Sequence, residues 1–106
     1  MFFNFMKKNY ESVSVGEIDN ISGKIELIDI REPYEYAGGH LAKAKNIPMG
    51  NLLDNTEKYL DKSKEYYIIC QSGARSSRAC NALASKGFKV INVQGGTGSY
   101  RGRLTR

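Results

Sequence analysis

Short apolar runs alternate with helix-like segments along nearly the whole chain, and this alternation limits the folds that are open to it. Strands buried on both faces form continuous apolar stretches, which distinguishes them from half-exposed strands. We predict strands at 12–14, 26–30, 44–47, 66–69 and 90–93, and helices at 15–21, after Pro33, at 52–60 and at 76–86, where Gly87 ends the last helix. This order predicts an α/β fold, a parallel sheet with helices on both faces.

The chain has 106 residues, a length that fits one compact domain. We expect residues 1–10 to form an N-terminal extension and residues 11–106 to form that domain. No apolar run approaches the roughly 20 residues of a membrane helix, and the start of the chain is apolar before it is basic, the reverse of a signal peptide. We therefore expect a soluble cytoplasmic protein with no membrane partner.

Few side chains in this sequence are suited to holding a metal. The two cysteines and the one histidine give no spaced set of zinc ligands and no disulfide framework. We expect no metal and no organic cofactor. The net charge of +5 is compatible with nucleic acid and equally with a small anionic substrate. Because the lysines are scattered and no nucleic-acid motif is present, we expect a solvated basic surface and no nucleic-acid partner.

The segment Cys70–Ser76 carries the strongest chemical signal, because it joins a buried strand to the start of a helix. Backbone N–H groups of a tight loop, together with a helix N-terminus, form a site for an anion. Gly73 gives the loop the necessary backbone freedom. A cysteine in that position is stabilised as its thiolate and becomes a nucleophile. The alternative is an inert buried cysteine in an ordinary turn.

The other side chains of this loop suit an anionic substrate. Arg75 offers a planar donor fork for an oxyanion. Ser72 and Ser76 can donate hydrogen bonds, and Ser76 or Ser77 can cap the helix. The predicted substrate-binding set is Gln71, Ser72, Gly73, Ala74, Arg75 and Ser76, with Cys70 as the catalytic residue.

Three blocks of the chain resemble the rhodanese (thiosulfate sulfurtransferase) family over residues 11–100. They are 27–36 with 39–41 and 44–48, then the loop 70–76, and finally 92–96 with an aromatic residue at Tyr100, where the family usually has tryptophan. The resemblance implies a five-stranded parallel sheet with flanking helices and a persulfide intermediate on Cys70. Phosphatases and arsenate reductases that resemble this family have one more residue between cysteine and arginine. The shorter loop here favours sulfur chemistry.

Several residues outside the loop have expected supporting roles. Asp29, Arg31 and Glu35 can form an ion pair that braces the mouth of the pocket. His40 matches a family position that mostly serves folding, with the imidazole bonded to a backbone group. Cys80 is expected to face the core with its helix neighbours Ala79 and Leu83, and a role as a resolving thiol is the alternative.

Two departures from the family pattern bear on the pocket. Lys43 stands where the family usually has glycine, and the tail 101–106 is shorter and more basic than usual. Together these departures predict an altered pocket rim. The arginines of the tail, Arg101, Arg103 and Arg106, either belong to a frayed solvated end or help to dock an anionic donor or an acidic partner protein.

These observations predict a sulfurtransferase of the thiosulfate type. Cys70 would take the outer sulfur of a small anionic donor and pass it to a thiol or to cyanide. The alternative is a sulfur-relay module that exchanges persulfide sulfur with a partner protein. A binding domain without catalysis is disfavoured by the intact cysteine loop, and a phosphatase by the loop length.

Overall fold

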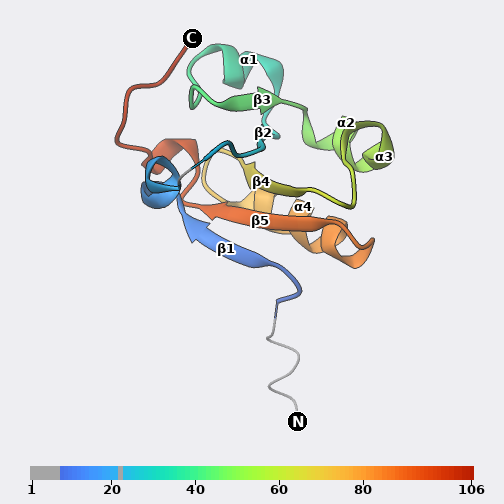
Figure 1. Cartoon of the computed structure of the whole chain (residues 1–106). Coiled ribbons are helices and arrows are strands. Elements are labelled where there is room, and N and C mark those ends of the chain that lie inside the picture. Colours follow the sequence, from blue (N-terminus) through green and yellow to red (C-terminus); the bar gives the residue numbers. More distant parts are fainter. Residues whose placement is uncertain (1–7, 22) are drawn as a thin grey trace.

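The computed structural model describes residues 8–21 and 23–106, and its centre is a five-stranded sheet in the order β1-β5-β4-β2-β3 (Figure 1). Every pair of neighbouring strands is parallel. The strands are β1 (Glu11–Ser14), β2 (Leu27–Asp29), β3 (Ala44–Asn46), β4 (Glu65–Ile69) and β5 (Lys89–Gln94). The predicted α/β fold with a five-stranded parallel sheet is confirmed.

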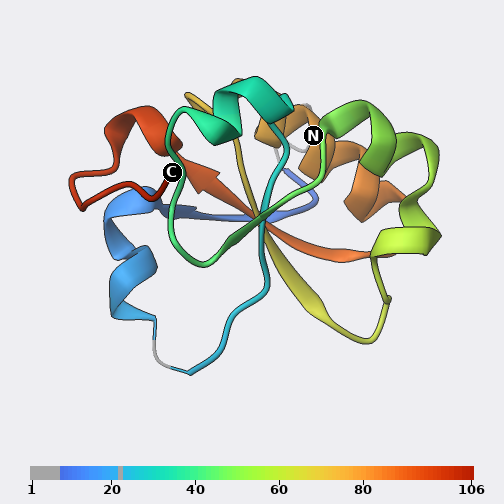
Figure 2. The ribbon, with the colours of Figure 1, turned by 90° about the horizontal axis from the view of Figure 1, so that it is seen from above.

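Helices cover both faces of the sheet. They are α1 (Pro33–Ala37), α2 (Met49–Asp54), α3 (Thr56–Tyr59) and α4 (Ala74–Ser85), with 3₁₀ helices η2 (Val15–Asn20) and η3 (Thr97–Ser99). Seen from above, α2, α3 and α4 lie on one side of the sheet and η2 on the other (Figure 2). None of the described helices is long and apolar enough to cross a membrane.

The pleat of β4 divides the core into two clusters. Ile68 points to the cluster beneath α2 and α4, where it packs with Leu52 and Leu83. Ile69 points to the opposite cluster beneath η2, which contains Ile18. All five side chains are 2% exposed or less, and burial of each contributes roughly 1.5–3 kcal/mol. With both of its faces covered, β4 is the central strand that carries Cys70.

Two helical segments differ from their predicted form. The helix expected over 52–60 is broken at Asn55, whose φ of −136° and ψ of 48° are not helical. The Thr56 hydroxyl donates to the carbonyl of Leu52 at 2.8 Å, so a second short helix begins there. The segment 15–21 is a 3₁₀ helix over Val15–Asn20, because β-branched residues and glycine favour the α-helix weakly.

The last long helix was predicted to begin two residues later than it does. It starts at Ala74 with Gly73 as its N-cap. Its predicted end is confirmed, since Gly87 has φ +93° and its N–H donates to the carbonyl of Ala84 at 3.0 Å. The helix therefore begins directly after the cysteine loop.

Segments from different strands meet beside Cys70 at the carboxyl edge of the sheet. The turn after β5 places its own N–H groups on the cysteine loop: Thr97 donates to the carbonyl of Cys70 at 2.8 Å, and Gly98 to the carbonyl of Gln71 at 2.9 Å. Loops at the carboxyl edge of a parallel sheet are the usual position of a site in such folds. The turn 95–99 thus fixes the cysteine loop from outside.

Replacing Gly96 by alanine should destabilise the protein severely. Gly96 has φ +64° and ψ −168°, a conformation that only glycine adopts easily, and an added Cβ would lie about 2.5 Å from the carbonyl oxygen of Gln71. Strain and collision together should lower the free energy of unfolding by about 3 kcal/mol or more, measured by urea denaturation.

Gly50→Ala is the matched control, because Gly50 lies in α2 and nothing stands within 4 Å of an added Cβ. Its effect should stay below about 1 kcal/mol and be stabilising if anything. Equal effects of the two variants would contradict the role assigned to the turn 95–99.

Candidate active site

The sulfur of Cys70 lies at the base of the cysteine loop and accepts hydrogen bonds from it. Cys70 is 0% exposed. The backbone N–H of Gly73 lies 3.1 Å from the sulfur and that of Ser76 lies 3.3 Å away. The Ser76 hydroxyl oxygen is 3.4 Å from the sulfur. The loop and the first turn of α4 thus surround one sulfur atom with donors, as an anion requires.

This geometry shifts the pKa of the Cys70 thiol. Burial acts to raise that pKa, because a charged sulfur loses its hydration. Hydrogen bonds from the Ser76 hydroxyl and from the N–H groups of Ser76, Gly73 and Ser72 outweigh burial, so the pKa lies below its ordinary value. A lower pKa increases the thiolate fraction at neutral pH, and the thiolate is the nucleophilic form.

Gly73 makes this geometry possible. Its φ of +105° belongs to the left-handed region, and this conformation turns its N–H toward the sulfur. The expectation that Ser76 or Ser77 caps the helix is wrong, because the helix has already begun at Ala74. Ser76 is instead buried inside the first turn, where its hydroxyl contacts the sulfur.

Asn92 is a residue of the site that was predicted only as part of the carboxy-terminal block. It lies in β5 and is 3% exposed. Its Oδ1 lies 2.5 Å from the hydroxyl oxygen of Ser76. The available sequence signal was an amide residue within the apolar run 90–93, since a buried amide needs a polar partner.

The guanidinium of Arg75 is bound by Glu35 of α1. Nη1 and Nη2 donate to the two carboxylate oxygens at 2.8 and 2.9 Å. This hydrogen bonding lowers the pKa of Glu35 from 4.5 to about 2 and raises the pKa of Arg75. In this structure the two terminal nitrogens of Arg75 bind a carboxylate, and the predicted binding of a substrate oxyanion by Arg75 stays a prediction.

A second, buried ion pair braces the neighbouring strand. Arg31 Nη2 lies 2.9 Å from Asp29 Oδ2, and the same guanidinium donates to the carbonyl of Gly39 at 2.7 Å and to Gln71 Oε1 at 3.1 Å. The predicted ion pair is present between Asp29 and Arg31, and its bracing of the pocket mouth stays a prediction. Glu35 does not belong to it. The pair anchors the side chain of the residue that follows Cys70.

Comparison with known proteins agrees with this architecture. The family model described as "Rhodanese-like domain" matches residues 14–102. "Putative sulfurtransferase YtwF" of Bacillus subtilis (strain 168) is 39% identical over 95 residues, which cover 90% of this chain and 91% of that protein. The chain belongs to the rhodanese-like family.

Two further comparisons extend this result. "Putative sulfur carrier protein YrkF" of Bacillus subtilis (strain 168) is 36% identical over 80 residues, covering 74% of this chain but only 43% of that longer protein. The crystal structure of a rhodanese-like domain protein from Staphylococcus aureus superposes with a TM-score of 0.80 at 32% identity, covering 90% of this chain and 96% of that one. The fold is therefore shared over nearly the whole rhodanese-like domain.

A hollow of about 450 Å³ lies beside the cysteine loop of this rhodanese-like domain. Gln71 forms part of its wall, and so do the only large apolar side chains that are exposed in the described part of the chain, Tyr34 and Leu104. The rest of the wall is formed by Arg31, Glu35, Gly38, Gly39, Thr97, Gly98 and Tyr100. Of the cysteine loop, the hollow therefore borders Gln71, the residue that follows Cys70.

The remaining loop residues contribute mainly backbone to the rhodanese-like site. The side chains of Ser72 and Ala74 are exposed at the surface of the loop. The Nδ1–H of His40 donates to the carbonyl of Tyr36 at 2.8 Å, and the imidazole stacks on the Tyr36 ring. Its predicted bonding to a backbone group is confirmed, and this contact anchors the end of α1.

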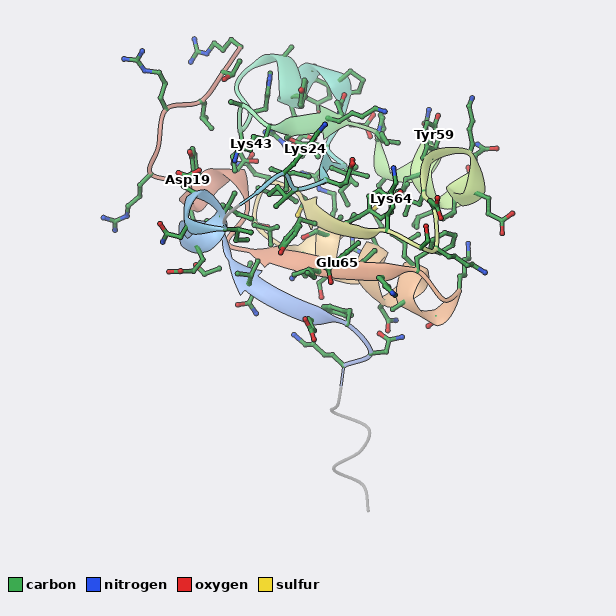
Figure 3. All side chains as sticks on the ribbon, in the orientation of Figure 1. Asp19, Lys24, Lys43, Tyr59, Lys64 and Glu65 are labelled. Atoms are coloured by element: carbon green, nitrogen blue, oxygen red, sulfur yellow. The ribbon has the colours of Figure 1, made fainter. Side chains whose placement is uncertain are left out.

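Lys43 does not alter the pocket rim. It is exposed just before β3, at the amino end of the strand (Figure 3), whereas Cys70 directly follows the carboxyl end of β4. The part of the rim prediction that rests on Lys43 is wrong, because the chain passes along β3 before it reaches the site. The tail does reach the hollow, since Leu104 forms part of its wall.

The basic tail is attached rather than frayed. Thr105 pairs with His40 in an antiparallel bridge, with backbone hydrogen bonds of 2.9 and 2.7 Å. Arg101, Arg103 and Arg106 are all exposed along it.

The second cysteine, Cys80, lies in the hydrophobic core. Cys80 is 0% exposed and packs in the same core cluster as Ala79 and Leu83, as predicted. Burial, with a contribution from the charge of Cys70, raises the pKa of Cys80 to about 12. Within the described residues, no group of three or more His, Cys, Asp or Glu side chains is placed to hold a metal ion.

Alkylation with iodoacetamide should therefore select Cys70. The rate should rise with pH as the thiol ionises, with a midpoint below the ordinary value of 9.0. Ser76→Ala removes one donor to the sulfur and should move the midpoint upward. Cys80→Ser should leave the profile unchanged, and Cys70→Ser should abolish the reaction below pH 9. A midpoint at or above 9.0 in the unmodified protein would contradict a stabilised thiolate.

The Glu35–Arg75 pair should contribute to stability in a pH-dependent way. Because the folded-state pKa of Glu35 is depressed to about 2 from 4.5, its contribution is present above pH 4.5 and is lost as the pH falls toward 2. Glu35→Gln should remove this part of the acid dependence of the unfolding free energy.

Glu57→Gln is a suitable control for that measurement, since Glu57 is exposed in α3 and belongs to neither ion pair of the described structure. Urea denaturation between pH 3 and pH 6 should show a flatter profile for Glu35→Gln alone. If Glu35→Gln and the unmodified protein lose stability in parallel, Glu35 does not have the depressed pKa.

Proposed function

We propose that this chain is a sulfurtransferase that carries a sulfane sulfur on Cys70. The observation that carries the proposal is the convergence of the Gly73 and Ser76 N–H groups on one buried sulfur, with the Ser76 hydroxyl oxygen 3.4 Å from it. Such donors stabilise a negative sulfur more than a neutral one. Membership of the rhodanese-like family and the resemblance to YtwF support the same chemistry.

The first half-reaction loads the sulfur. The Cys70 thiolate attacks the outer sulfur of thiosulfate, and a new S–S bond forms as the S–S bond of the donor breaks. Sulfite leaves with the electron pair of the broken bond. The product is a persulfide whose outer sulfur is negative at neutral pH, and the backbone N–H groups of residues 71–76 hold that charge.

The second half-reaction unloads it. A nucleophilic acceptor, either a thiolate or cyanide, attacks the outer sulfur, and Cys70 leaves as the thiolate. The donors that stabilise the resting thiolate also stabilise this leaving group, so they act in both halves. Because the donor leaves before the acceptor reacts, the kinetics should be ping-pong.

The loop side chains have proposed roles in binding. Arg75 binds an anionic donor once Glu35 releases its guanidinium, and Gln71, held by Arg31, lines the entrance. Gly73 and Ala74 provide the turn and the helix start, while Ser72 contributes its N–H. Asp29 and Arg31 are proposed as supporting residues that keep this edge of the sheet in place.

A sulfur-relay role with a protein partner is the second candidate, and one observation favours it. Glu35 binds both terminal nitrogens of Arg75, so in the resting site a carboxylate already pairs with the charge that would attract a small oxyanion. A persulfide presented by another protein does not need that charge. The resemblance to YrkF, whose name describes a sulfur carrier, agrees with this alternative. Both free thiols suit a reducing compartment such as the cytoplasm.

Incubation of the reduced protein with thiosulfate should add one sulfur atom, detected by intact mass spectrometry and removed by a reductant. Cys80→Ser should load like the unmodified protein, and Cys70→Ser should not load at all. Added cyanide should then release thiocyanate in an amount equal to the sulfur carried.

The donor separates the two candidates. If thiosulfate fails but a low-molecular-weight or protein persulfide loads Cys70, the relay function holds and the thiosulfate reaction does not. If no donor loads Cys70 although its thiol is alkylated normally, sulfur transfer by this residue is refuted.

A further inference from the structure

The Ser76 hydroxyl has three neighbours that can accept a hydrogen bond and only one hydrogen to donate. Its oxygen lies 3.4 Å from the Cys70 sulfur, 3.2 Å from the carbonyl of Gly73 and 2.5 Å from Oδ1 of Asn92. A serine hydroxyl donates once and can accept twice. The direction of its hydrogen therefore depends on what Asn92 presents to it.

Asn92 can present either a donor or an acceptor. Its side-chain oxygen and nitrogen occupy nearly equivalent positions, and the hydrogen-bond network decides which one faces a neighbour. With Oδ1 toward Ser76, the hydroxyl donates to Asn92, and its lone pairs face the sulfur. That arrangement suits a protonated Cys70, whose S–H then donates to the hydroxyl oxygen.

The reverse arrangement suits the thiolate. With Nδ2 toward Ser76, the amide donates to the hydroxyl oxygen, and the hydroxyl hydrogen is free to point to the negative sulfur. A hydrogen bond to an ionised acceptor is about twice as strong as a neutral one. The hydrogen bonds that link Asn92, Ser76 and Cys70 can therefore run in either direction. One direction fits the neutral thiol of Cys70, and the other fits its thiolate.

We propose that Asn92 is a positioning residue whose amide turns with the charge of Cys70, directing the Ser76 hydroxyl to the sulfur when the sulfur is negative. This role rests on the proposed function, because it concerns the thiolate that starts the reaction and leaves at its end. In the loaded state the negative charge resides on the outer sulfur, so the Cys70 sulfur no longer needs a hydrogen bond from the Ser76 hydroxyl. It needs that hydrogen bond again when Cys70 becomes the leaving group.

The charged groups around Cys70 do not supply this response themselves. Arg75 of α4 is paired with Glu35 of α1, whose pKa is about 2. Cys80 of α4 has a pKa of about 12. The Asp29–Arg31 pair comes from β2 and the turn after it, and its two opposite charges offset each other. The contact from β5 is the neutral Asn92.

The direct test is the side-chain amide signal of Asn92 in ¹⁵N-labelled protein, followed by NMR as the pH is raised through the alkylation midpoint of Cys70. The signal should shift with that same midpoint. Asn46 is an internal control, because its Nδ2 donates to the carbonyls of Asp29 and Arg31 and should stay constant. In Ser76→Ala the Asn92 response should largely vanish, although the field of the thiolate remains.

A double-mutant cycle gives a second, independent readout. Asn92→Leu keeps the side-chain shape but leaves the hydroxyl divided between the sulfur and the Gly73 carbonyl. It should slow alkylation of Cys70 at pH 7 by about fivefold when Ser76 is present, the effect of one buried hydrogen bond. With alanine at 76, Asn92→Leu should change the rate by less than about twofold.

The outcomes separate this inference from the proposed function. The inference is overturned if the Asn92 amide signal does not shift as Cys70 ionises, or if it shifts equally in Ser76→Ala. Either result holds regardless of whether sulfur donors load Cys70. Equal slowing by Asn92→Leu in both backgrounds also overturns it. A normal amide response in a protein that no donor can load supports the inference and refutes sulfur transfer.

Discussion

The hydrogen bonds that Cys70 receives from its own loop are the interactions on which this end of the molecule depends. A buried thiolate without donors is costly, because it loses its water and gains nothing in exchange. Here the N–H groups of Gly73 and Ser76 replace that water. They reach the sulfur only because β4 ends at residue 69, Gly73 takes a left-handed conformation, and α4 begins immediately afterwards. The backbone conformation of the loop therefore determines both the start of α4 and the stabilisation of the Cys70 thiolate.

The neighbouring strands hold the loop in that conformation from both sides. On the β5 side, Thr97 and Gly98 donate to the carbonyls of the first two loop residues. On the β2 side, Arg31 binds Asp29 and reaches Gln71. These contacts join segments far apart in sequence and bring no free charge to the sulfur. They leave the backbone donors and the Ser76 hydroxyl as the groups that set its reactivity.

Local patterns predicted the sheet and the cysteine loop. Continuous apolar runs and a glycine-containing turn between a strand and a helix can both be recognised from neighbouring residues alone. The cysteine loop singled out Cys70 as the reactive residue, and Asp29 and Arg31 were expected to form an ion pair beside the pocket. The break at Asn55 and the early start of α4 depend on backbone conformation and could not be read from helix propensity. The Glu35–Arg75 pair and the Ser76–Asn92 contact join residues 40 and 16 positions apart, and a single sequence does not reveal which polar residues such distances bring together. Lys43 is the opposite case. It departs from the family pattern and was therefore expected at the pocket rim, but it lies away from the site.

The central claim is that the cysteine loop exists to hold sulfur on Cys70, and a crystal structure of the protein after loading with a sulfur donor tests it most directly. The account predicts one additional sulfur atom bonded to the Cys70 sulfur, within hydrogen-bond distance of backbone N–H groups of residues 71–76, with Cys80 unchanged. Additional sulfur on Cys80, or an outer sulfur directed away from the loop N–H groups, would contradict it.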